Sequence, residues 1–143
     1  MKKSIILTFW ALSGIFLVVL AEFLFPPLRN LLRGSELFLI PPALFSLLGL
    51  ILLVLALKQG TGGKINKFLI LTGASATGFF VTIVLHNLFY ALGILASHIT
   101  VLKYLMEAFH IAFFIIAIFI CPAGFFVGVI GVIWLLIKQR KQS

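Results

Sequence analysis

The chain has 143 residues, of which 63% are hydrophobic and 10% are charged. Its mean hydropathy of +1.29 lies outside the range of soluble globular domains and excludes that class. The formal net charge of +8 does not indicate nucleic acid as a partner, because the basic residues stand in short groups at the ends of apolar stretches. The sequence therefore predicts an integral membrane protein whose main contact is the lipid bilayer.

Four apolar stretches are each long enough to cross a bilayer, because a helix needs about 20 residues to span the ~30 Å of hydrocarbon. The first stretch ends at Pro26 and Pro27, which lack backbone donors and cannot extend a helix. The second has Pro41 and Pro42 near its start, where missing donors cost least. We therefore predict an all-α membrane protein in which residues 1–143 form one domain, an antiparallel bundle of four transmembrane helices. The expected spans are about 4–25, 37–57, 68–96 and 108–137.

The connections between the later spans differ in character. Residues 58–67 contain three glycines and are predicted to form a flexible turn between adjacent helices. Residues 97–106 are moderately polar and are predicted to form a link or an interfacial helix. The fourth span then starts at about Glu107 and ends in the basic tail of residues 138–141.

Basic residues predict the orientation, because the cytoplasmic ends of membrane spans carry an excess of lysine and arginine. With the N-terminus inside, eight of the 11 basic residues lie on the cytoplasmic side: Lys2, Lys3, Lys58, Lys64, Lys67, Lys138, Arg140 and Lys141. The other three, Arg29, Arg33 and Lys103, lie outside. We therefore expect both termini to be cytoplasmic, in the cytoplasmic (inner) membrane of a prokaryote. This orientation puts all acidic residues and histidines in the outer half of the protein.

Steps of three or four residues place small and polar side chains on one face of the third span: Thr72, Ser75, Phe79, Thr82, His86, Tyr90, Gly93 and Ser97. The fourth span repeats this pattern: Glu107, His110, Phe114, Ala117, Cys121, Gly124, Gly128 and Gly131. Helices associate in lipid by close backbone approach at small residues, so the GxxxG motif of the fourth span is expected to pack against the third. The predicted helix-packing residues are Gly73, Gly78, Gly124, Gly128 and Gly131.

Glu22 is the first candidate for chemistry, because an ionisable residue in a span costs about 2.5–3.5 kcal/mol at the bilayer centre. A carboxyl between helices can exchange a proton with a substrate or a cation. We therefore predict a transport or proton site formed by Glu22, His86 and Tyr90. The alternative for Glu22 is solvation, or pairing with Arg29 or Arg33, near the interface. The alternative for His86 is a neutral imidazole that is hydrogen-bonded across the bundle.

Glu107 and His110 stand one helical turn apart, a spacing that carboxylate-bridged metal sites in helical bundles use. A metal site formed by Glu107, His110 and His86, with Glu22 as a further ligand, is the second candidate. No other cofactor is predicted. Counting ~1.5 Å per residue from the cytoplasmic ends puts Glu22 and His86 at one height and His110 roughly two to three turns higher.

Triad catalysis is not expected, because the chain has no Asp and its single cysteine, Cys121, lies within a span. In its four spans and its first-span glutamate, Glu22, the chain resembles the small multidrug resistance exporters. Their glutamate lies closer to mid-span, and we do not assign the family. Three functions stay open. The first is a non-enzymatic bundle that acts as a subunit, by binding or by self-association. The second is a proton- or cation-coupled transporter or channel using Glu22 and His86, and the third is the metal site.

Overall fold

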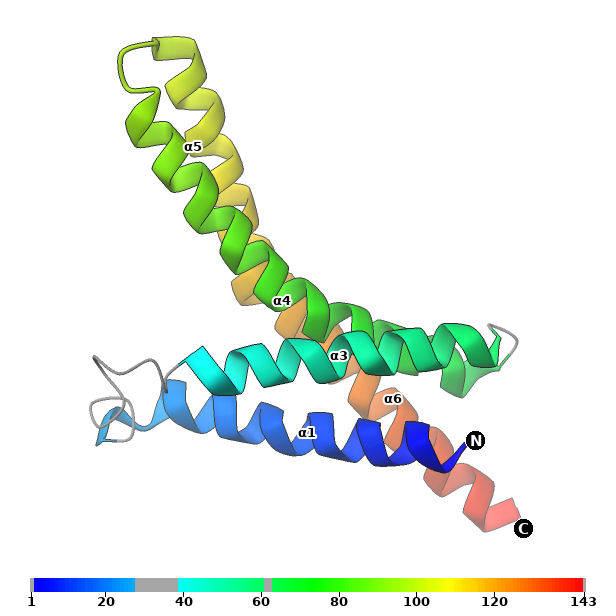
Figure 1. Ribbon diagram of the computed structural model, residues 1–143. Coiled ribbons are helices and arrows are strands. Elements are labelled where there is room, and N and C mark those ends of the chain that lie inside the picture. The colour runs from blue at the N-terminus through cyan, green and yellow to red at the C-terminus, as the bar shows by residue number, and fades with distance from the viewer. Residues whose placement is uncertain (1, 28–38, 61–62, 143) are drawn as a thin grey trace.

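The computed structural model describes residues 2–27, 39–60 and 63–142, and this part of the chain is helical. Its helices are α1 (Lys3–Leu24), α3 (Ile40–Gln59), α4 (Lys64–Leu95) and a long last helix made of α5 (Thr100–Ile115), the π-helical turn η2 (Ile116–Ile120) and α6 (Cys121–Gln142) (Figure 1). Four helices are long and apolar enough to cross a membrane, which confirms the predicted all-helical class. Glu36, Arg29 and Arg33 lie outside the described residues.

The helices pack in chain order: α3 lies between α1 and α4, and α4 lies between α3 and the last helix (Figure 1). The start of α4 lies against the end of α3, where Asn66 contacts Ala56. Farther along, the Ser46 hydroxyl donates to the Thr77 carbonyl at 3.2 Å. Beyond this contact, Figure 1 shows the second half of α4 paired with α5 and diverging from α1 and α3. We call this projecting pair of helices, residues 84–115, the arm.

The helices differ in length relative to a bilayer. At ~1.5 Å per residue, the 22 residues of α1 and the 20 residues of α3 match the ~30 Å hydrocarbon layer. The 32 residues of α4 and the 43 residues from Thr100 to Gln142 exceed this layer by roughly 18 Å and 34 Å. These two helices have to tilt strongly or extend beyond the layer.

Glycines bring α4 close to both of its neighbours. A Cβ atom on Gly73 would lie 2.7 Å from the Leu53 backbone nitrogen and 2.8 Å from the Gly49 carbonyl oxygen, so α3 and α4 touch backbone to backbone. On the other side of α4, a Cβ atom on Gly128 would lie 2.9 Å from the Thr72 backbone nitrogen. Three further glycines lie between α4 and the last helix. Gly124 faces Ser75, Gly131 faces Phe68, and Gly78 faces Cys121. The close contacts of these glycines are therefore made within one chain.

The last helix starts at Thr100, earlier than the predicted span, and so includes residues 100–106. Within this added stretch Met106 packs against α4, where a Cβ atom on Gly93 would lie 3.6 Å from the Met106 Cβ. As a consequence, Lys103 projects from a helix and has a fixed position relative to Glu107.

An irregular turn interrupts the last helix just before Pro122. In η2 the Cys121 N–H donates to the Ile116 carbonyl, five residues earlier instead of the usual four. Pro122 has no N–H to offer the Ile118 carbonyl, and its ring crowds that oxygen. The wider π turn gives the ring room, so the helix continues through the proline to Gln142.

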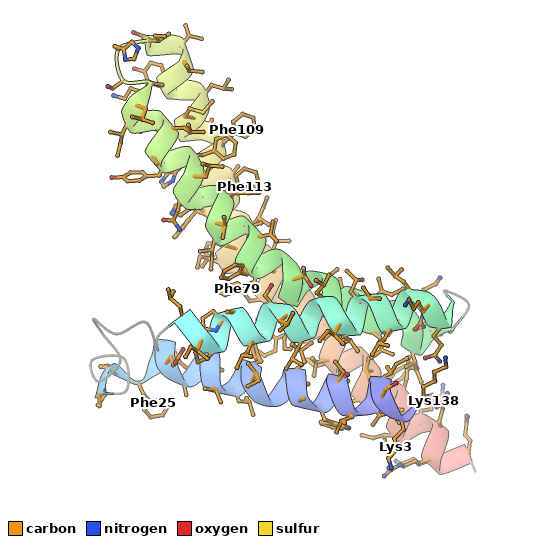
Figure 2. All side chains as sticks on the ribbon, viewed as in Figure 1. Lys3, Phe25, Phe79, Phe109, Phe113 and Lys138 are labelled. Carbon is orange, nitrogen blue, oxygen red and sulfur yellow. The ribbon has the colours of Figure 1, made fainter. Side chains whose placement is uncertain are left out.

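Both termini and the turn between α3 and α4 gather at one end of the molecule, and the arm points away from it (Figure 1). Figure 2 shows Lys3 of α1 and Lys138 of α6 at this end. Lys64 and Lys138 line the same shallow pocket, so α4 and α6 bring their basic residues together. We call this end, which carries Lys3, Lys64 and Lys138, the basic end.

Asn66 joins α3 to α4 at the basic end. Its side chain is 5% exposed, and its Nδ2 atom donates to the Ala56 carbonyl at 3.0 Å and to the Gly60 carbonyl. These carbonyls lie at the end of α3, where helical N–H donors run out. We expect Asn66→Ala to lower the free energy of unfolding by about 2 kcal/mol, because it leaves the buried Ala56 carbonyl without its side-chain donor.

Asn87→Ala is the matched control for this prediction. The Asn87 side chain donates at 2.9 Å to the Ile83 carbonyl, which lies within α4 and keeps its helical N–H donor. This replacement is expected to change stability by less than ~0.5 kcal/mol. Unfolding by SDS in mixed micelles, followed by circular dichroism, compares the two variants. Equal losses would contradict the role of Asn66.

Candidate functional site

Two histidines hold the arm together. His86 of α4 and His110 of α5 stack with their ring centroids 4.0 Å apart and their planes 21° from parallel. Nδ1 of His86 lies 3.0 Å from the His110 carbonyl oxygen, and Nδ1 of His110 lies 3.2 Å from the His86 carbonyl oxygen. The two contacts are reciprocal, so each helix supplies one donor and one acceptor.

These contacts determine which ring nitrogen carries the hydrogen. A carbonyl oxygen only accepts a hydrogen bond, so Nδ1 of each ring is the donor. In a neutral imidazole, Nε2 then holds the lone pair. A metal ion binds such a lone pair close to the ring plane, and two stacked, nearly parallel rings do not direct their lone pairs at one common position. This geometry favours a role in joining two helices over a role in sharing one ion.

The predicted height of His110 is wrong. Counting along the sequence places His110 roughly two to three turns above His86, whereas the two rings are in contact. The cause is the offset of the last helix, because Gly131, and not the end of the span near Ile137, lies against Phe68. The last helix therefore extends farther toward the basic end, and His110 comes level with His86.

Aromatic rings surround the histidine pair. The Phe114 ring lies 5.3 Å from the His86 ring, and the Tyr90 ring lies 5.2 Å from the His110 ring. A second set of ring contacts joins the same two helices: Phe89 with Phe109 at 5.0 Å and Phe89 with Phe113 at 5.4 Å (Figure 2). Together these contacts hold α4 and α5 in one relative position along the arm.

A groove with a volume of about 340 Å³ opens beside the histidine pair, and we call it the polar groove after the polar side chains among its mostly apolar walls. Its polar lining comes from both helices of the arm: Tyr90, Ser97, Lys103, Glu107 and His110. Lys103 and Glu107 stand about one helical turn apart on α5, so the groove offers an ammonium group and a carboxylate to one ligand. Such a set can bind by hydrogen bonds and ion pairs. Lys103 is not among the predicted site residues, although its four-residue spacing from Glu107 is a signal that the sequence contains.

Glu22 lies apart from the groove, on a helix that packs against α3 (Figure 1). Its side chain is 1% exposed, and Oε2 has no hydrogen-bond partner among the described residues. Within that part of the chain, no hydrogen bond or ion pair joins Glu22 to His86 or Tyr90. The structure therefore brings His86 and Tyr90 together around His110 and places Glu22 elsewhere.

The predicted metal ligands are only partly assembled. His86 and His110 are in contact through their rings, and Glu107 lines the groove beside His110. Across residues 2–27, 39–60 and 63–142, no three side chains of His, Cys, Asp or Glu are placed to hold one metal ion. The metal site and the transport site both stay predictions.

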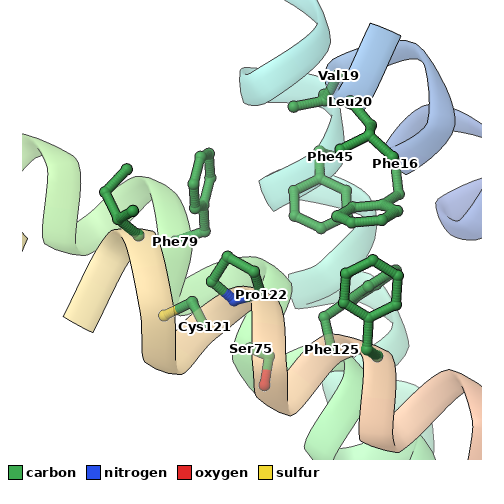
Figure 3. A pocket seen from close by; sticks show the side chains of 11 residues that line it. Phe16, Val19, Leu20, Phe45, Ser75, Phe79, Cys121, Pro122 and Phe125 are labelled. Carbon is green, nitrogen blue, oxygen red and sulfur yellow. The ribbon is translucent and has the colours of Figure 1, made fainter. Parts of the chain in front are cut away.

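An apolar pocket that was not predicted lies where α1, α3, α4, η2 and α6 meet (Figure 3). Its aromatic residues come from four different helices: Phe16 from α1, Phe45 from α3, Phe79 from α4, and Phe125 and Phe126 from α6. Phenylalanine is frequent in every apolar stretch, so no spacing within one stretch signals that these rings converge.

Comparison of the chain with protein-family models, with curated proteins and with solved structures finds no match. No function is therefore transferred to this chain from another protein. Its function has to be argued from the arm, the polar groove and the four helices that are long and apolar enough to cross a membrane.

Proposed function

We propose that the protein is a non-enzymatic membrane protein that acts by binding a second membrane protein, as a subunit or by self-association. The observation that carries this proposal is the engagement of His86 and His110 with each other's backbone, which commits both rings to holding α4 against α5. The result is a pair of helices with a fixed geometry and a polar groove along it. Such a pre-organised surface suits binding, because little order has to be created when a partner arrives.

The packing of α4 favours binding over transport. A transport route through the membrane needs polar groups along a path inside the protein. Gly73 and Gly128 instead bring α3 and α6 against α4 at backbone distance. Glu22, the remaining candidate for proton exchange, lies on α1 and outside the histidine cluster.

The proposed orientation is an antiparallel bundle of four spans in a prokaryotic cytoplasmic membrane, with both termini in the cytoplasm. Its support is the basic end, where Lys3, Lys64 and Lys138 lie with both termini (Figures 1 and 2). Lysine and arginine are retained on the cytoplasmic side of a membrane. The arm then reaches the outer leaflet, and Lys103 and Glu107 meet water at the extracytoplasmic surface.

A photoreactive side chain tests whether the arm is the binding surface. Tyr104 of α5 is 65% exposed and Leu7 of α1 is 72% exposed, so benzoylphenylalanine at either position reaches the surroundings without disturbing the core. We expect irradiation of intact cells to give discrete protein adducts from position 104 and none from position 7. Adducts between two differently tagged copies show self-association, and adducts with another membrane protein show a subunit role. Equal, diffuse labelling from both positions would refute the proposal.

A further inference from the structure

The apolar pocket at the helix junction lies deep in the membrane spans. It has a volume of about 170 Å³, and its lining includes residues near the middle of their helices, such as Phe16 in α1, Phe79 in α4 and Pro122 in the last helix. Helices that match or exceed the bilayer thickness place such residues within the hydrocarbon layer. The molecules that reach this pocket are therefore lipids and other apolar solutes of the membrane.

The pocket exists because the helices around it pack with different neighbours. α1 packs against α3 and α6 packs against α4. A bridge of rings connects the two pairs: Phe16 lies 4.5 Å from Phe125 and 5.1 Å from Phe126. Phe45 of α3 completes this bridge, with its ring 5.0 Å from that of Phe125. Figure 3 shows the ring cluster on one side of the pocket and Pro122 on the other.

The lining of the pocket selects an apolar occupant. Among its 11 residues, Ser75 supplies the one hydroxyl and Cys121 a weakly polar thiol. A buried water needs two to four polar partners, and an engineered apolar cavity of ~150 Å³ in another protein stays dry and binds benzene. Ile118 and Phe126, which are 41% and 46% exposed, line the pocket where it meets the protein surface. The opening therefore faces the lipid chains.

We propose that this pocket binds the end of a phospholipid acyl chain. The inference is independent of the function proposed for the arm. A chain that moves from the bilayer into the pocket is already out of water, so it gains dispersion contacts with the ring walls and no further hydrophobic burial. We therefore expect a moderate enrichment of lipid chains, about threefold over an ordinary lipid-facing site.

The test uses the purified chain in vesicles of phosphatidylethanolamine and phosphatidylglycerol. A trace of the phosphatidylglycerol carries a diazirine at the end of one acyl chain, and mass spectrometry locates the label after irradiation. The reference site is Leu47 of α3, which is 53% exposed. We expect label per residue at Ile118 and Phe126 to exceed that at Leu47 by about threefold.

Two variants fill the pocket from different helices. Leu20→Trp adds bulk from α1, and the label on Phe126 is expected to fall to the level at Leu47. Ile118→Trp adds bulk from η2 and is expected to have the same effect. Leu17→Trp is the matched control, because Leu17 is 64% exposed and is not part of the pocket lining, so the label is expected to stay unchanged.

Pocket label in the wild-type chain that does not exceed the label at Leu47 overturns the proposal. Label that persists in a pocket-filling variant with wild-type circular dichroism also overturns it. If one of the two pocket-filling variants does not fold, the other still tests the proposal. The unlabelled phospholipid of the vesicles is present in large excess over the trace of label, so only the ratio of the pocket label to the label at Leu47 is compared. Loss of the excess label in the pocket on addition of an isoprenoid alcohol at a small fraction of the phospholipid concentration would overturn the assignment to a phospholipid.

Discussion

Gly73→Ala is expected to lower the free energy of unfolding by about 2 kcal/mol. The added Cβ would lie 2.7 Å from the Leu53 nitrogen, 2.8 Å from the Gly49 carbonyl oxygen and 3.0 Å from the Leu53 Cα. All three are backbone atoms, so no side-chain rotation relieves the overlap and α3 itself has to move. Overpacking of this kind costs up to about 3 kcal/mol. Alanine recovers about 1 kcal/mol of it through its higher helix propensity.

Gly14→Ala is the matched control, because it changes the same atom in a helix without meeting a neighbour. A Cβ atom on Gly14 of α1 has no heavy atom within 4 Å, so only the gain in helix propensity remains. We expect this variant to be more stable than the wild type by about 0.5–1 kcal/mol. In SDS-induced unfolding, the two replacements should therefore shift the midpoint in opposite directions. Shifts of the same sign would contradict the backbone contact at Gly73.

The helices could be predicted from the sequence because the hydropathy of each stretch indicates a helix and the prolines at its ends indicate where the helix begins or stops. Within the described residues, α1 ends at Leu24, just before Pro26, and α3 begins at Ile40, just before two prolines. The face that each helix turns toward its neighbours can also be predicted from its own sequence. Steps of three or four residues put His86 and Gly128 on one face each, and those faces contact a neighbouring helix.

The offset of one helix along the axis of its neighbour cannot be predicted from the sequence of either helix alone. A pattern that repeats every three or four residues matches a neighbouring helix equally well after a shift of one turn, so it does not set the height of His110 relative to His86. Contacts of particular side chains select one offset, which places Gly131 against Phe68. The polar groove and the apolar pocket depend on this offset and on where the arm diverges. The sequence therefore indicates some residues of the groove, such as Glu107 and His110, but not how the residues of either site come together.

His86→Gln is expected to weaken the pairing of α4 with α5, whereas His86→Asn is expected to preserve it. The Nδ2 atom of asparagine takes nearly the place of histidine Nδ1 and can donate to the His110 carbonyl. Glutamine carries its amide farther out, near the place of Nε2, and removes the donor from α4 to that carbonyl. A hydrogen bond between helices in a membrane contributes about 1 kcal/mol, which corresponds to a change in pairing of about fivefold.

A disulfide toward the tip of the arm can measure this pairing. A Cβ atom on Gly93 would lie 3.6 Å from the Met106 Cβ, within the ~3.5–4.5 Å that a disulfide requires. The chain with Gly93→Cys, Met106→Cys and Cys121→Ala then carries two thiols, one on each helix. Their effective concentration, measured against a glutathione redox buffer, reports how tightly the helices are paired. We expect His86→Gln to lower it about fivefold and His86→Asn to leave it unchanged.

The contrast between these two replacements separates a structural from a chemical role of His86. If Nδ1 holds the arm, asparagine substitutes for histidine in pairing although it removes Nε2. If Nε2 holds the arm through a bound ion, asparagine fails as fully as glutamine does, because neither amide replaces an imidazole ligand. Equal losses would therefore contradict the Nδ1 contact and favour the metal site of Glu107, His110 and His86. A loss confined to His86→Gln leaves the histidines as the support of the polar groove, whose own ligand then has to be recognised by Lys103, Glu107 and Tyr90.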